Sequence, residues 1–76
     1  MKGDIQLTYE IVLKGQLSST METYFEPMHI AKIDVAYTRL VGIIPDQAVL
    51  FGLLSRIRDL NIELIELRQV KISETN

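Results

Sequence analysis

Apolar residues recur at three- and four-residue spacing between Pro45 and Asn61, and this spacing predicts a long amphipathic helix. Asp46 fits its first turn, because the carboxylate can accept hydrogen bonds from the free N–H groups there. Asn61 fits its end, because Asn tolerates the left-handed backbone that often follows a helix. The stripe expected to face a core is formed by Val49, Leu50, Leu53, Leu54, Ile57 and Leu60. The rest of the chain is expected to be organised around this helix.

Two residues of the helix do not fit a plain solvent-exposed side. Phe51 falls on the polar side, roughly 100° from Leu50 on the helical wheel. Gly52 costs about 1 kcal/mol relative to Ala in a helix interior. Gly52 therefore indicates a close approach of a strand or loop, or a helix–helix contact with another subunit. Phe51 is either a lone exposed aromatic residue or part of a subunit interface, where aromatic residues are enriched.

Alternation of apolar and polar residues predicts four strands. The first spans residues 5–14, two more lie within residues 28–44, and the last spans residues 62–72. The turn inside 28–44 is expected around Ala36 to Thr38, but it has no Asn-Gly or Asp-Gly signal, so one long bent strand is the alternative. Gly42 suggests a bulge or a close contact with the helix. The imperfect alternation of the last strand indicates a bulge or burial on both faces.

A short helix is predicted between Leu17 and Pro27. Ser19, followed three residues later by Glu22, fits a capping box, and Pro27 ends the segment. A helix of about two turns depends on tertiary packing, so an ordered loop is the alternative.

The resulting order is strand, short helix, strand, strand, long helix, strand. This order predicts an α+β, ferredoxin-like βαββαβ fold, with a four-stranded antiparallel sheet and both helices on one face. The first and third strands should be central. Residues 1–76 are expected to form a single domain, with residues 73–76 as a disordered tail.

Apolar residues left over by this arrangement predict a self-association surface. The face of the sheet without helices, the last strand and the outer side of the long helix are its candidate locations. The interface candidates are Val12, Leu40, Phe51, Ile65, Val70 and Ile72. A chain of 76 residues is near the lower limit for an independent core, and such chains often gain stability from oligomerisation. A homodimer is therefore the expected state, and a larger protein partner is the alternative.

The composition argues against several other classes of protein. The chain has no Cys and one His, which excludes disulfides and the usual zinc ligand sets, so neither a metal nor a cofactor is expected. The net charge is −2 and the basic residues are dispersed, which argues against nucleic-acid binding. The predicted third strand also lacks the aromatic residues of RNA-binding sheets. Without a signal-like segment or an apolar run of about 20 residues, a soluble cytoplasmic protein is expected.

The segment DQAVLFGLLSRIRDLNIELIEL resembles a group of small, uncharacterised bacterial proteins. Their helix has the pattern Asp-Gln-Ala-x-Leu-x-Gly-Leu-Leu-x-x-Ile-Arg-Asp-Leu, and the resemblance extends over roughly residues 9–70. In that group the position of Phe51 is often His and that of Asn61 is often Gly. The resemblance implies a small self-associating protein and carries no known activity, substrate or cofactor.

Candidate chemistry in the sequence is sparse. His29 could act as a general base only with a partner such as Asp34 or Glu26, and no paired carboxylates, phosphate-binding loop or nucleophile motif is present. We therefore expect a non-enzymatic interaction module, self-associating or acting as an accessory subunit. The alternative is a small dimeric protein that binds or transforms an apolar ligand between sheet and helices. The residues that would line such a ligand site are Tyr9, Met21, Tyr24, Phe25 and His29.

Overall fold

The computed structural model describes residues 7–71. It is an α+β arrangement of four antiparallel strands and two helices, one of them short, which confirms the fold class at this level. The elements are β1 (Leu7–Lys14), the 3-10 helix η1 (Ser19–Phe25), β2 (His29–Ile33), β3 (Tyr37–Ile43), α1 (Gln47–Asp59) and β4 (Leu64–Lys71). The predicted tail and Ile72 lie outside the described residues.

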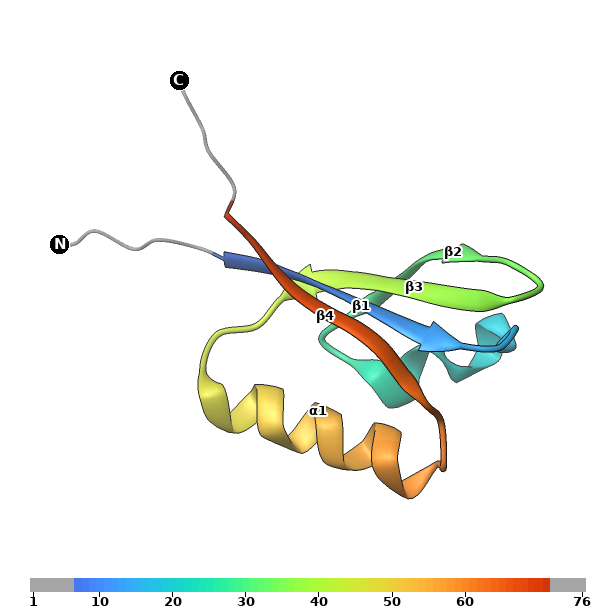
Figure 1. Ribbon diagram of the computed structural model, residues 1–76. Coiled ribbons are helices and arrows are strands. Elements are labelled where there is room, and N and C mark those ends of the chain that lie inside the picture. Colours follow the sequence, from blue (N-terminus) through green and yellow to red (C-terminus); the bar gives the residue numbers. More distant parts are fainter. Residues whose placement is uncertain (1–6, 72–76) are drawn as a thin grey trace, which may run out of the picture.

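The four strands form one sheet in the order β2-β3-β1-β4. Strands β1 and β3 are central, and β2 and β4 form the two edges. Both α1 and η1 lie on the same side of the sheet (Figure 1). We call this side the covered face and the opposite side the open face.

The core fills the space between the covered face and the helices. Ile11 and Leu13 of β1 are fully buried there, as the strict alternation of β1 predicts. The buried cluster is completed by Phe25, Met28, Leu40, Ile44, Leu53 and Ile57. The space between the sheet and the helices is therefore occupied by side chains.

Both predicted ends of α1 are confirmed. Asp46 Oδ1 accepts a hydrogen bond from the Val49 N–H at 3.0 Å, and Asn61 has a φ of 61°. Along the stripe, Leu53 and Ile57 are buried, and the other apolar residues within the helix are half-buried. Leu60 is the exception, because it is the capping residue beyond the last turn and is 38 % exposed.

The predicted short helix is present, but the capping box predicted for it does not form. Ser18, one residue before the expected cap, accepts a hydrogen bond from the Thr20 N–H through its side chain at 3.2 Å. Glu22 is used elsewhere, because its Oε2 accepts from the Ile30 N–H at 2.9 Å. The carboxylate that was expected to cap η1 therefore connects η1 to β2.

Residues 28–44 form a hairpin, so the bent-strand alternative is wrong. The turn falls at residues 34–36, about two residues earlier than predicted. Asp34 explains this position, because its Oδ1 accepts from the Val35 N–H at 3.3 Å and its own N–H donates to the Tyr37 carbonyl at 2.7 Å. A bulge, one of the two explanations for the imperfect alternation of the last strand, is confirmed at Ile65, which the register between β1 and β4 skips.

The two glycines singled out in the sequence have opposite surroundings. A Cβ on Gly42 would lie 2.8 Å from the Pro27 carbonyl oxygen and 2.9 Å from the Met28 Cα. The close approach at Gly42 thus exists, but its partner is the segment before β2 rather than α1, and no bulge occurs there. A Cβ on Gly52 would meet nothing within 4 Å, so the close approach expected there is wrong.

Candidate functional site

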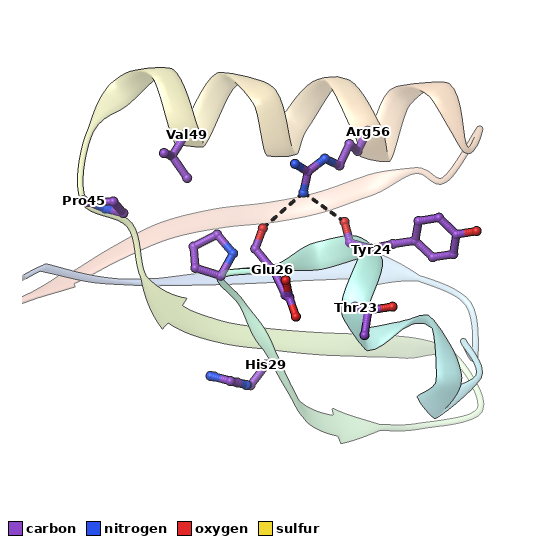
Figure 2. Close-up of a pocket in the computed structure, with 8 residues that line it drawn as sticks. Thr23, Tyr24, Glu26, His29, Pro45, Val49 and Arg56 are labelled. Atoms are coloured by element: carbon purple, nitrogen blue, oxygen red, sulfur yellow. Dashed lines mark hydrogen bonds between the residues drawn. The ribbon is translucent and has the colours of Figure 1, made fainter.

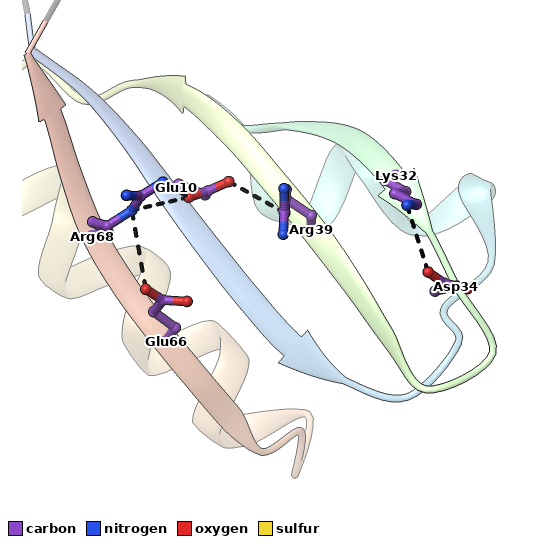
Figure 3. A network of polar contacts seen from close by, with 6 residues as sticks. All are labelled: Glu10, Lys32, Asp34, Arg39, Glu66 and Arg68. Atoms are coloured by element: carbon purple, nitrogen blue, oxygen red, sulfur yellow. Dashed lines mark hydrogen bonds and ion pairs between the residues drawn. The ribbon is translucent and has the colours of Figure 1, made fainter.

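The open face carries a network of charged side chains centred on Glu10 (Figure 3). The Arg68 Nη2 donates to Glu10 Oε1 at 2.6 Å, and the Arg39 Nε lies 3.2 Å from Glu10 Oε2. The Arg39 N–H has no acceptor aligned with it, so this second contact is an ion pair rather than a hydrogen bond. Glu66 extends the network, with its Oε2 4.0 Å from the Arg68 Nε. The centre of the open face is therefore polar.

The Glu10 network makes stability depend on pH. The hydrogen bond from Arg68 and the charges of Arg39 and Arg68 outweigh partial burial, and they lower the pKa of Glu10 below its ordinary value of 4.5. A lowered pKa in the folded state adds stability above the unfolded-state pKa, and this stability is lost as the pH falls through the folded-state pKa. Wild type should therefore exceed Glu10→Gln in unfolding free energy at pH 7.

Urea denaturation of the two proteins between pH 7 and pH 3 measures this difference. The difference should stay constant down to about pH 5 and shrink below it. A difference that grows on acidification would contradict the assignment. Glu63→Gln is the matched control, because Glu63 is exposed and its nearest cation, Lys14, is 3.8 Å away.

Two of the interface candidates, Leu40 and Val12, are not exposed on the open face. Leu40 lies on the covered face and is fully buried, because it is paired with Ile11 across β1 and β3. Val12 does lie on the open face, but it is only 6 % exposed between its cross-strand neighbours Arg39 and Glu66. The aliphatic stems of such long side chains cover apolar surface. The open face thus offers less apolar area than the sequence predicts.

Strand β4 carries the largest group of exposed apolar side chains, whereas Tyr24, Val35 and Ile43 are exposed singly on other elements. Four of its side chains are between 37 and 52 % exposed, and they are Leu64, Ile65, Leu67 and Val70. We call these four residues the β4 surface, with Leu64 and Leu67 on the covered face and Val70 on the open face. Ile65 and Val70 were interface candidates from the sequence, whereas Ile72 lies outside the described residues.

The last turns of α1 lie close to the start of β4. Between α1 and the start of β4 runs a groove of about 460 Å³, whose lining includes Leu54, Arg58 and Leu64. Phe51 is 59 % exposed and lies seven residues before Arg58, so both occupy the same stripe of the helix. The exposed aromatic ring therefore lies on the helix stripe that reaches this groove at Arg58, one to two turns before the groove itself.

A second hollow separates η1 from α1. It has a volume of about 720 Å³, and its lining includes Pro27, Pro45 and Val49. On one side the Arg56 Nη1 donates to the carbonyl oxygens of Tyr24 and Glu26 at 3.2 and 3.1 Å (Figure 2). We call this hollow the η1–α1 depression. The Arg56 guanidinium therefore already donates hydrogen bonds to the protein's own backbone.

The structure brings together two of the five predicted ligand-site residues. Tyr24 and His29 both line the η1–α1 depression, but their rings point away from each other (Figure 2). Phe25 is fully buried in the core, and Met21 and Tyr9 are half-buried against it. The Tyr9 hydroxyl accepts from the Gln69 Nε2 at 3.1 Å. The His29 Nδ1 lies 3.7 Å from Glu22 Oε2, not beside Asp34 or Glu26.

Sequence reasoning missed the Glu10 network and the contacts of Arg56. Strand alternation alone would have put Glu10 and Arg68 on polar faces, but pairing them requires the register between β1 and β4. The Arg56 contacts are to backbone carbonyls, which leave no sequence signal. Within residues 7–71, no group of three or more His, Cys, Asp or Glu side chains is arranged to hold a metal ion.

These observations define a small α+β domain with a charged open face and an edge strand that exposes several apolar side chains. A family model described as a domain of unknown function (DUF8691) matches residues 8–68, and the chain belongs to this family. No curated protein and no solved structure matches the chain. Neither of the helices in the described part is both long and apolar enough to cross a membrane.

Proposed function

We propose that this protein is a non-enzymatic interaction module that self-associates as a homodimer. The observation that carries the proposal is the exposure of apolar side chains on the β4 surface and at Phe51. Exposed apolar residues that gather in one region mark interaction sites more often than scattered ones do. A domain of this size also gains much from burying such residues, because its own core is small.

The arrangement of elements supports a ferredoxin-like fold for this module. Read from β4, the strand order is β4-β1-β3-β2, and each helix connects an edge strand to a central one. Right-handed connections of this kind place both helices on one face and leave the other face and both edges open. An open edge is a surface on which a second sheet can be added. A bacterial origin and a cytoplasmic location stay predictions from the sequence.

Light scattering coupled to size-exclusion chromatography tests self-association directly. At micromolar concentration the expected mass is twice the chain mass of 8.7 kDa. Dilution should shift the mass towards that of the monomer, because the association is reversible. A mass equal to one chain at every concentration would refute the proposal.

Phe51→Glu should weaken the dimer about tenfold or more, because it places a charge in the apolar region beside β4. Sedimentation velocity over a dilution series measures the change in dissociation constant. Tyr24→Glu is the matched control, since Tyr24 is a similarly exposed aromatic residue (57 %) on η1. An equal effect of both substitutions, or none from Phe51→Glu, would place the interface away from this side of α1.

A second candidate function is the binding of a small apolar ligand, now in the η1–α1 depression. The observation in its favour is the volume of the depression, which falls in the range of ligand pockets. Amide chemical shifts during titration with a library of small aromatic compounds test it. Shifts confined to residues 23–29 and to Val49 and Arg56 would support binding there, and their absence would count against it.

A further inference from the structure

Strand β4 is an edge of the sheet, so one side of its backbone has no neighbouring strand within the described residues. Such an edge presents N–H and C=O groups to any strand that can align with it. Resting on the self-association proposed above, we infer that the partner on this edge is β4 of a second copy. The two strands run antiparallel about a two-fold axis that passes between the two Leu67 residues.

The order of charges along β4 selects this register. Glu66 and Arg68 flank Leu67, and both project from the open face. Residues directly opposite each other in an antiparallel pair share a face. Centring the pair on Leu67 therefore sets Glu66 opposite the partner's Arg68, and the two-fold axis repeats this contact.

Neighbouring registers are penalised by the same charges. Centring on Glu66 would place two carboxylates opposite each other, and centring on Arg68 would do the same with two guanidinium groups. Like charges directly opposite each other destabilise a strand pair. The side chains that commonly protect an edge strand thus permit one self-complementary alignment and oppose its neighbours.

The existing contacts of these side chains are compatible with the added pair. Arg68 is already oriented by Glu10, with its Nε and Nη2 both donating to Glu10 Oε1. Its side chain is still 59 % exposed, and that of Glu66 is 53 % exposed. Both groups can therefore reach a partner without breaking the Glu10 contact.

The bulge at Ile65 limits the length of the ladder. A bulge bends its strand, so regular pairing is confined to residues close to the axis. The remaining buried area must then come from the covered face. There Leu67 is 39 % exposed beneath the axis, and Phe51, 59 % exposed, lies on the helix stripe that reaches the groove between α1 and β4 at Arg58. Two copies related by this axis bring these apolar side chains together.

Charge reversal tests the register. Glu66→Arg leaves two positive residues on β4, and Arg68→Glu leaves two negative ones, so each variant alone should dimerise about ten- to a hundredfold more weakly than wild type. An equimolar mixture should recover dimerisation, because every cross-strand pair in the mixed dimer is again of opposite charge. Sedimentation velocity measures all three samples, and circular dichroism verifies folding. Glu63→Arg, just before β4, is the matched control for added charge.

Single cysteines provide a second test that involves no charge reversal, and the chain has no cysteine of its own. Leu67→Cys should form a disulfide-linked dimer under mild oxidation, because residues on the axis lie within disulfide range of each other. Glu66→Cys and Arg68→Cys report the two neighbouring registers, and Ala31→Cys reports the opposite edge, β2.

These experiments distinguish a failure of self-association from a failure of the proposed β4 interface. A wild-type monomer at high micromolar concentration overturns both self-association and this interface. A wild-type dimer whose charge-reversed variants associate as tightly as wild type, or one that is cross-linked faster through Ala31→Cys than through Leu67→Cys, overturns the β4 interface but not self-association. A dimer that is cross-linked faster through Glu66→Cys or Arg68→Cys than through Leu67→Cys overturns the register alone.

Discussion

Gly42→Ala is expected to lower the free energy of unfolding by about 2–3 kcal/mol, the upper part of the range for overpacking a core. The added methyl group would lie 2.8 Å from the Pro27 carbonyl oxygen and 2.9 Å from the Met28 Cα. Both are backbone atoms, so no side-chain rotation relieves the contact. The segment before β2 would have to move away from β3, and Met28 is fully buried in the core. Chemical denaturation at neutral pH measures the loss.

Gly52→Ala is the matched control, because it makes the same substitution where nothing lies within 4 Å of the new methyl group. It should stabilise the chain by about 0.5–1 kcal/mol, because Ala is the better helix former. If Gly42→Ala left stability unchanged, the contact between β3 and the Pro27–Met28 segment would not be as tight as described. Dimerisation that weakens in Gly52→Ala would instead favour the helix–helix contact predicted at that position.

Thr38→Val should cost about 2–4 kcal/mol of unfolding free energy, because it removes a buried hydroxyl that makes two hydrogen bonds. Thr38 is fully buried in β3. Its Oγ1 donates to the Gly15 carbonyl at 2.9 Å and accepts from the Leu17 N–H at 3.1 Å. Valine has nearly the same shape, so it leaves both backbone groups without their partner while the packing is conserved.

Thr38→Ser separates hydrogen bonding from packing, since it keeps the hydroxyl and removes only the methyl group. It should retain most of the stability that Thr38→Val loses, and thermal unfolding of the three proteins side by side provides the comparison. If Thr38→Ser were the less stable of the two variants, the methyl group rather than the hydroxyl would be the important contribution. The two hydrogen bonds of Thr38 to Gly15 and Leu17 would then contribute less to stability than its packing.

The parts of the fold that were predictable from the sequence depend on local signals. Asp46 and Asn61 define α1 because capping involves residues only a few positions apart. The strict alternation of β1 likewise places Ile11 and Leu13 in the core without knowledge of any partner strand.

The parts that were not predictable depend on which strands meet and in which register. Leu40 was expected on the open face, and only its pairing with Ile11 shows that it points to the covered face. Ser18 and Ser19 are chemically equivalent caps, and the structure uses Ser18 while Glu22 accepts from the Ile30 N–H, a contact between η1 and β2 that the sequence does not specify. Where apolar surface remains exposed likewise follows from how far α1 covers β4, which the sequence pattern does not specify.

The position of Arg56 between two backbone carbonyls has a consequence for the order in which the molecule opens. Tyr24 is near the end of η1 and Glu26 directly follows the helix, and the carbonyls of both accept hydrogen bonds from the Arg56 side chain in the last turns of α1. A fluctuation that lifts this part of α1 from the sheet therefore also releases the end of η1. We therefore expect these two segments, about thirty residues apart in sequence, to open together in local unfolding.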